Sequence, residues 1–376
     1  MPDESAALEA PKDQAKEAPP QVINLPIGTI VGKKYKITHK LGEGGCGSVY
    51  KVEDIEDKTP YAMKVEFAAT DSGNVLKMEV QVLTMMKSKK HVARCVASGK
   101  KKEYSYMVMT LLGESLDSIV RKHGPFLNVS SQVRIGICVL FGIKQLHDIG
   151  YLHRDLKPAN VALGYKGSGD ERFFLVLDFG LARQFITEKQ DGKKMRRPRE
   201  KSLFRGTARY CSVAMHDRYE QGRVDDLWAL VYMLAELRCQ LPWEDVDEKP
   251  NYGSIFQDVI GNMKRVCPDS DLFAKSPVQM LEFVKIVRNT QFYHRPEYDK
   301  LYKLLEEVMI NAGYKWSDLY HWESEKNKEN KVAKLSKLFV GKKGATTPTK
   351  DSAEGYDPNA PPYFTVEDFT SNPLGF

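Results

Sequence analysis

Two short polar stretches in the middle of the chain carry residue types suited to moving a proton and holding a metal ion. Residues 153–160 read His-Arg-Asp-Leu-Lys-Pro-Ala-Asn, and residues 178–180 read Asp-Phe-Gly. Transfer of a phosphoryl group to a hydroxyl group needs an acceptor for the hydroxyl proton. It also needs oxygen ligands for Mg²⁺, which reduces the charge repulsion between phosphate and nucleophile. The two stretches together contain the residue types for this chemistry.

Each of these requirements is met by a particular residue. We predict that Asp155 accepts the hydroxyl proton and that Lys157 lies near the transferred phosphoryl group. Asn160 and Asp178 supply the amide and carboxylate oxygens that Mg²⁺ prefers. A chance occurrence of two unrelated loops does not explain why a glycine-rich stretch and a strand lysine precede them in this order.

The glycine-rich stretch covers residues 42–49, which read Gly-Glu-Gly-Gly-Cys-Gly-Ser-Val. The spacing of Gly42, Gly44 and Gly47 is weak evidence alone, because simple turns and dinucleotide-binding loops look similar. A dinucleotide fold needs a helix directly after the glycines, whereas β-prone residues 48–52 follow here. This context favours a loop folded over the phosphates of ATP, because glycine lets backbone N–H groups approach phosphate oxygens closely.

Lys64 lies in the run Ala-Met-Lys-Val at residues 62–65, downstream of these glycines. A lone lysine on a strand is usually a solvated side chain, so the evidence is its position between the glycine loop and residues 153–160. We predict that Lys64 contacts the α- and β-phosphates of ATP. Its ammonium group then needs a fixed anion, and Glu79 on the following helical stretch is the expected partner.

The elements that must position these residues change in type along the chain. Short β-branched or aromatic runs separated by turn residues predict a small antiparallel sheet, with strands at 35–38, 47–52, 61–65 and 106–111. Apolar residues at helical spacing predict one helix over 74–86 against this sheet. After a hinge at 112–113, the same periodicity predicts long helices over 133–146 and 227–237. Asp226, before the apolar run of the second helix, is typical of a helix N-cap.

The predicted fold class is therefore α+β, with a small sheet lobe and a larger, mostly helical lobe. We expect four segments: a disordered leader at 1–28, the sheet lobe at 29–112, the helical lobe at 113–325 and a tail at 326–376. The tail begins with a basic, polar stretch suited to a linker. Its aromatic end, residues 363–376, is expected to dock back on the body of the protein.

Composition excludes several other classes of protein. The chain has 376 residues, 42% hydrophobic residues, 28% charged residues and a net charge of +6, which is ordinary for a soluble globular protein. Apolar runs of bilayer length and a signal peptide are absent, so we expect no membrane partner and a location in the cytoplasm, with the nucleus as an alternative. The six cysteines are widely spaced, which argues against a disulfide framework or a zinc site.

The motifs resemble those of the protein kinase superfamily, and more narrowly of the casein kinase 1 group, over roughly residues 29–325. Residues 206–214 read Gly-Thr-Ala-Arg-Tyr-Cys-Ser-Val-Ala where most kinases carry Ala-Pro-Glu, and residues 111–116 and 241–243 also fit this group. Residues 75–80, 91–94, 178–185 and 204–207 are most similar to tau-tubulin kinases.

The resemblance implies a bilobal kinase fold and serine/threonine specificity, since Lys157 and Thr207 match residues that contact the catalytic aspartate. It implies that Asp226 anchors the catalytic loop. The residues expected around the adenine, with Met109 as gatekeeper and the hinge at Leu111 and Leu112, are Leu41, Val49, Ala62, Met109, Leu111, Leu112 and Ala162. It also implies activity without phosphorylation of the activation segment, so Ser202 need not be a switch.

Some positions depart from the family pattern. Cys46 stands at the loop tip where an aromatic residue is usual. Arg209 matches an arginine of the group's site for anionic substrates, but residues 244–248 are acidic where that site usually gains a lysine, which argues against a preference for pre-phosphorylated substrates. The basic run 193–201 is read as a solvated loop, with an acidic-substrate site or a nuclear signal as alternatives.

We therefore expect an Mg-ATP-dependent kinase that acts as a monomer on serine and threonine residues of proteins, with cytoskeleton-associated proteins as candidate substrates. The main alternative is a pseudokinase that serves as a scaffold, but Lys64, Asp155, Asn160 and Asp178 are all present. A nucleic-acid-binding module would draw on the positive charge, but no recognition motif supports it.

Overall fold

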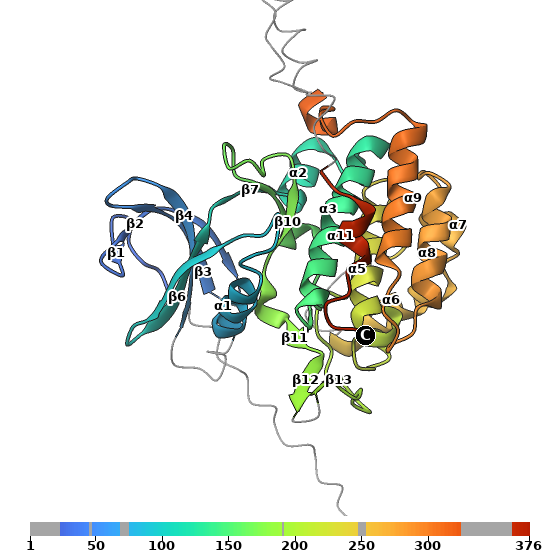
Figure 1. Cartoon of the computed structure of the whole chain (residues 1–376), viewed down its shortest axis with the longest axis horizontal. Helices are drawn as coiled ribbons and strands as arrows, with labels where there is room; N and C mark the ends of the chain where they lie inside the picture. The colour runs from blue at the N-terminus through green and yellow to red at the C-terminus, as the bar shows by residue number, and fades with distance from the viewer. Residues whose placement is uncertain (1–22, 45–46, 68–74, 190–191, 247–252, 325–362) are drawn as a thin grey trace, which may run out of the picture.

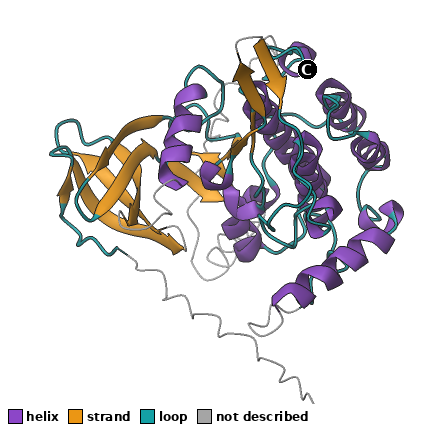
Figure 2. Cartoon of the chain, turned by 90° about the horizontal axis from the view of Figure 1, so that it is seen from below, coloured by secondary structure: helices purple, strands orange, loops and turns teal. Residues whose placement is uncertain are grey.

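The computed structural model describes residues 23–44, 47–67, 75–189, 192–246, 253–324 and 363–376. These residues form a strand-rich lobe beside a larger helical lobe (Figure 1). Figure 2 shows the same division, with most strands at one end of the molecule and most helices at the other. The fold class is therefore the predicted α+β arrangement of two lobes.

The small lobe is an antiparallel sheet with strand order β1-β2-β3-β4-β6-β5. The strands are β1 (Ile30–Val31), β2 (Tyr35–Gly44), β3 (Gly47–Asp54), β4 (Pro60–Phe67), β5 (Cys95–Lys100) and β6 (Tyr104–Thr110). Exposure alternates along β3, so one face of the sheet packs into a core around Ile37, Tyr50 and Val52. The other face of β3, which carries Val49, is only partly buried.

Helix α1 (Val75–Met85) lies between β4 and β5 in the chain, within one residue of the predicted bounds. It lies on the side of the sheet that faces the helical lobe (Figure 1). Leu76, Val82 and Leu83 are buried and belong to the core cluster of the helical lobe. The helix therefore connects the two lobes through packing.

The helical lobe is built around α3 (Val129–Asp148), which is buried along nearly its whole length, and α5 (Arg223–Glu236). Further helices of this lobe are α2 (Leu116–His123), α4 (Val213–His216), α6 (Gly253–Val266), α7 (Asp269–Leu272), α8 (Gln279–Asn289), α9 (Tyr298–Asn311) and α11 (Val366–Thr370). Among the described residues, none of the helices has both the length and the apolar character needed to cross a bilayer.

Short strands and 3₁₀ turns carry the polar stretches between these helices. They are β7 (Leu112–Ser115), β8 (Tyr151–Leu152), η2 (Pro158–Asn160), β9 (Val161–Gly164), β10 (Phe174–Val176), η3 (Phe179–Leu181), β11 (Arg183–Gln184), β12 (Ile186–Lys189) and β13 (Gly192–Met195). Strands β10-β9-β7 form one small sheet, and β11 pairs with β8. Leu112, part of the hinge predicted at 112–113, opens β7, which pairs with β9.

Candidate active site

Asp226, a buried residue of α5, holds the start of the loop at residues 153–160. One carboxylate oxygen of Asp226 accepts hydrogen bonds from the main-chain N–H of His153 and from Nε2 of His147, and the other accepts one from the N–H of Arg154, each at 2.8 Å. Burial acts to raise the pKa of Asp226, but the hydrogen bonds from His147 and from the main-chain N–H of His153 act against it, and the pKa lies below its usual range. The carboxylate therefore stays ionised and fixes the backbone of the loop.

This arrangement corrects the reading of Asp226 as an N-cap. The N-cap of α5 is Gly222, whose N–H donates to the Asp225 side chain at 2.6 Å. Asp226 lies inside the first turn and points to the loop instead. Arg154, whose N–H it holds, has a φ of 69°, a conformation that costs free energy in a non-glycine residue and persists only where the surroundings enforce it.

Asp155 is part of a compact polar triangle. Its Oδ1 accepts a hydrogen bond from the Thr207 hydroxyl at 2.7 Å, and its Oδ2 lies 2.8 Å from the Lys157 ammonium nitrogen. Lys157 also donates to the Thr207 hydroxyl oxygen at 3.1 Å. Asn160 donates from Nδ2 to the main-chain oxygen of Asp155 at 2.9 Å. The structure therefore brings together all four residues predicted to carry out the reaction.

Gly206 lets the segment with Thr207 approach this triangle. Its φ is +94°, and a Cβ atom at this position would lie 2.5 Å from the main-chain oxygen of Arg154. A side chain here would force the two loops apart. The close approach of Thr207 to Asp155 thus depends on glycine at the preceding position.

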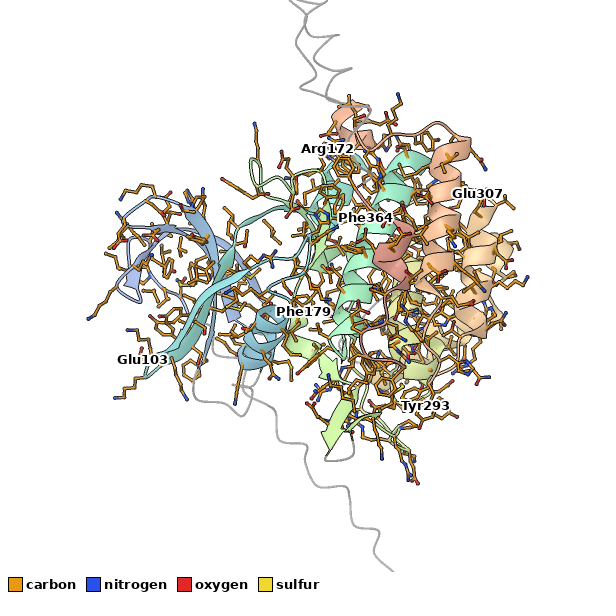
Figure 3. All side chains as sticks on the ribbon, in the orientation of Figure 1. Glu103, Arg172, Phe179, Tyr293, Glu307 and Phe364 are labelled. Atoms are coloured by element: carbon orange, nitrogen blue, oxygen red, sulfur yellow. The ribbon has the colours of Figure 1, made fainter. Side chains whose placement is uncertain are left out.

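Lys64 lies between the two carboxylates expected from the sequence. Its Nζ is 2.7 Å from Oε2 of Glu79 on α1 and 3.0 Å from Oδ1 of Asp178. Burial acts to lower the pKa of Lys64, but the two carboxylates outweigh it and raise the pKa above its usual value. Phe179, next to Asp178, is buried with its ring 5.5 Å from the ring of His153, and Figure 3 shows it between α1 and the helical lobe. Glu79 and the 178–180 stretch are therefore in place around the lysine.

The strand register aligns the residues expected around ATP on one face of the sheet. Val49 pairs with Lys64, and Ala62 pairs with Met109. Directly opposite residues share a face, as do residues two apart on one strand, so all four side chains lie on the face that carries Lys64. The other predicted residues lie near this face. Leu41 is half-exposed in β2, Leu111 links β6 to β7, Leu112 opens β7, and Ala162 is buried in β9 opposite Ser115.

The glycine stretch connects β2 to β3, as predicted from the residues that follow it. At Gly47 the φ is +125°, and a Cβ atom would lie 2.0 Å from the main-chain oxygen of Val65, so only glycine fits. At Gly42 and Gly44 a Cβ atom would meet nothing within 4 Å. The protein itself does not require glycine at these two positions, which fits a loop that a bound phosphate approaches. Cys46 lies outside the described residues.

Comparison with known proteins agrees with this geometry. Residues 35–308 match the protein kinase domain. The chain is a protein kinase. The kinase is 69% identical over 353 residues to a Caenorhabditis elegans protein whose name gives it as a serine/threonine-protein kinase, covering 94% of this chain and 97% of that protein. It is 30% identical over 314 residues to the serine/threonine-protein kinase spe-6 of the same organism, covering 83% and 80%.

The relationship to casein kinase 1 is also visible in the comparisons. The kinase is 33% identical over 296 residues to the casein kinase I homolog RAG8 of Kluyveromyces lactis, covering 78% of this chain and 54% of that protein. It is thus a serine/threonine kinase with a casein-kinase-1-like relationship, and a kinase domain implies the use of ATP.

Asp178 and Asn160 have the oxygens that a magnesium ion would need. The carboxylate of Asp178 is 42% exposed, and Lys64 holds its pKa below the usual range against the effect of burial. Asn160 uses its amide nitrogen for Asp155, which leaves the amide oxygen for a ligand. No group of three or more metal-ligating side chains is found in the described parts of the kinase. Two oxygens fit an ion that takes its other ligands from phosphate and water.

Arg209 is placed differently from what an anion site requires. Its Nη2 lies 2.9 Å from Oε1 of Glu244 and also contacts Glu236, and its Nε donates to Glu236 at 2.6 Å. Two carboxylates therefore neutralise the guanidinium within the kinase itself. Asp247 and Glu248, the rest of the acidic run, lie outside the described residues.

The basic run 193–201 is also more structured than a solvated loop. Its first residues belong to β13, which pairs with β12 in a hairpin. Arg199 binds the buried carboxylate of Glu220 and donates to the Ser202 hydroxyl at 3.1 Å. Arg183 lies 3.5 Å from the same carboxylate. Part of the positive charge of the run is therefore paired inside the activation segment.

Two residues near the active site were missed from the sequence. His147 contributes to the anchoring of Asp226, and Lys264 on α6 donates from its buried ammonium group to the main-chain oxygens of Ala208 and Cys211 at 2.7 and 2.6 Å. Both lie in helices whose apolar periodicity indicates a buried face but not a polar partner. A polar residue within such a face was the sequence signal that could have pointed to these two contacts.

Proposed function

We propose that this kinase transfers the γ-phosphoryl group of Mg-ATP to serine and threonine hydroxyls of proteins with Asp155 as the proton acceptor, and that it is of the tau-tubulin kinase type. The observation that carries the proposal is the triangle of Asp155, Lys157 and Thr207. In this triangle the Thr207 hydroxyl binds one carboxylate oxygen of Asp155 and the Lys157 ammonium group binds the other, so the orientation of the carboxylate is fixed.

Asp178 and Asn160 are the proposed ligands of Mg²⁺, which when bound neutralises charge on the β- and γ-phosphates. The protein performs the remaining tasks. Lys64, fixed by Glu79, binds the α- and β-phosphates. The substrate oxygen forms a bond to the γ-phosphorus, the bond from that phosphorus to the β–γ bridging oxygen breaks, and ADP leaves. Asp155 takes the hydroxyl proton, and Lys157 neutralises charge on the transferred group.

The test is phosphate incorporation into casein or a microtubule-associated protein by the purified kinase with Mg-ATP. We expect labelling on serine and threonine by the wild-type kinase and none by Asp155→Asn, because the amide cannot accept the proton. Asp299→Asn is a control, since this carboxylate lies 3.9 Å from the exposed ammonium group of Lys303 on α9, away from the triangle. Equal labelling by Asp155→Asn and wild type at matched melting temperatures would exclude the proposed role.

We also propose that the kinase does not require a phosphorylated residue near its target, because Glu236 and Glu244 neutralise Arg209. The ratio of kcat/KM for peptide pairs that differ only in an upstream phosphoserine should be close to one. Glu244→Gln should raise this ratio in favour of the phosphorylated peptide. A strong preference of the wild-type kinase for the phosphorylated peptide would contradict the proposal.

The sequence similarity to tau-tubulin kinases supports a cytoskeleton-associated substrate, and we propose that a single chain carries out the reaction. Tubulin and a microtubule-associated protein should be labelled more efficiently than unrelated proteins of similar charge. Light scattering during turnover should give the mass of one chain. Equal labelling of unrelated proteins or a dimeric mass would count against these two points.

A further inference from the structure

Residues 363–376 lie on the helical lobe, where they contact helices α3 and α9 that precede them in the chain. In Figure 1 helix α11 of this segment lies against α3 and α9, and Figure 3 shows Phe364 among the side chains there. Phe364 and Phe369 are 2% and 0% exposed. The Phe369 ring stacks on Tyr302 of α9 with centroids 4.3 Å apart, and the Phe364 ring lies 5.1 Å from that of Phe141 on α3. The segment therefore fills an aromatic groove between two helices.

Polar contacts fix the backbone of the segment in this groove. The Tyr302 hydroxyl donates to the main-chain oxygen of Phe364 at 3.0 Å. Arg295 donates to the main-chain oxygens of Phe369 at 3.2 Å and of Ser371 at 2.9 Å. Recognition of main-chain oxygens by buried or fixed donors sets one register for the segment. This distinguishes a specific docking mode from loose apolar contact.

The N-terminal half of the segment contacts the loop that follows α1. The ring of His91 in this loop stacks on Phe173 with centroids 4.1 Å apart and lies 5.4 Å from the Phe364 ring. Lys90 pairs with Asp368 of the segment at 3.6 Å. Because α1 carries Glu79, the partner of Lys64, the segment supports the loop that sets the position of this helix.

The last residues of the segment contact the start of the activation segment, just after residues 178–180. Leu374 and Phe376 pack on a separate cluster formed by Leu152, Phe185 and Ile186. Leu152 directly precedes His153 and pairs with Arg183 across β8 and β11. The same few residues thus contact both the loop after α1 and the base of the activation segment.

We propose that residues 363–376 are a docking segment that binds the groove between α3 and α9 of its own chain. Bound there, the segment holds the ion pair of Lys64 with Glu79 and the activation segment in their assembled positions. The groove between α3 and α9 is thus occupied by a segment of the same chain. The inference rests on the kinase reaction but not on the identity of the substrate.

The test uses the full-length chain with Phe364→Ala and Phe369→Ala combined, and a synthetic peptide of residues 363–376. The variant should lose about tenfold in kcat/KM, within the range of ordinary coupling between sites. Hydrogen exchange should become faster at residues 87–93 and 183–189. The peptide should bind the variant and restore both properties, whereas a peptide with both phenylalanines replaced by alanine should restore neither. Thr370→Ala, with an exposed side chain, is the matched control and should behave as wild type.

Several results would overturn the proposal. Full activity and unchanged exchange in the variant would do so, as would lost activity that the peptide fails to restore. If the variant does not fold, exchange in the wild-type chain decides, because docking requires residues 364–371 to be protected. A chain-swapped dimer in light scattering would replace the intramolecular partner with a second copy and refute the proposal. Asp155→Asn separates this test from that of the proposed reaction, since it should be inactive with normal exchange and no response to the peptide.

Discussion

Replacing Asp226 by asparagine tests whether the buried carboxylate positions the catalytic loop. The amide keeps one oxygen acceptor, so at least one of the N–H donors from His147, His153 and Arg154 would face an NH₂ group. An unsatisfied buried donor costs about 1–3 kcal/mol, and the remaining hydrogen bonds lose roughly 1 kcal/mol each with the charge. The free energy of unfolding should therefore fall by about 3–5 kcal/mol, in the range found when buried charged partners are removed.

The effect on catalysis follows from the displaced backbone of the loop. A shift of a fraction of an ångström at Asp155 should lower kcat by up to about a hundredfold. KM for ATP should change little, because Lys64 and the sheet face are held by other contacts. Steady-state kinetics and thermal unfolding of the same preparations measure both effects.

The control is Asp225→Asn, one residue earlier on α5. Asp225 is also buried, and its carboxylate caps the helix and accepts a hydrogen bond from Ser212 instead of holding the catalytic loop. Burial raises the pKa of Asp225 to about 6, so a neutral amide is a smaller change there. If Asp226→Asn keeps the wild-type kcat, or if both variants lose kcat equally, the anchoring role assigned to Asp226 is wrong.

Two further predictions concern Thr207 and His216. Thr207→Ala should lower kcat roughly tenfold to a hundredfold, because a hydrogen bond to a charged group contributes about 1.5–3 kcal/mol. Thr207→Ser should retain most of the rate, and an alanine variant at the wild-type rate would show that the hydroxyl is dispensable. Burial and the charge of Lys264 lower the pKa of His216 to about 4, from 6.5. The folded chain then binds fewer protons than the unfolded chain between these values, so the free energy of unfolding falls as the pH drops through this window. The advantage of wild type over His216→Gln in melting temperature should shrink from pH 7 to pH 5, and a constant difference would contradict this pKa.

The candidate site could be predicted largely because its parts are local in sequence. Asp155, Lys157 and Asn160 lie on one short loop, and the structure brings Lys64, Glu79 and Asp178 together as expected. The strands and long helices were also predicted correctly in type, because alternation and helical spacing report which face is buried. The chemical roles of these residues remain predictions for the kinetic tests.

The features that could not be predicted depend on partners distant in the chain. Propensity alone ranks Asp226 above glycine as an N-cap, but hydrogen bonds to the catalytic loop determine its position, and Gly222 caps the helix. The strand at Leu112 exists because β9 pairs with it. The neutralised state of Arg209 depends on Glu236, which lies on α5. An aromatic chain end indicated docking, but the groove it fills is formed only when α3 and α9 pack together.

The position of residues 363–376 has a consequence for synthesis of the protein. They leave the ribosome after α3 and α9, so these helices must fold at first with the groove around Tyr302 and Phe141 uncovered. Exposed aromatic surface on a folding chain favours aggregation and is bound by chaperones. A premature stop codon or a bulky fusion just before this segment would leave that surface permanently open, and such a chain would be expected to be lost through aggregation and degradation even though every catalytic residue is present.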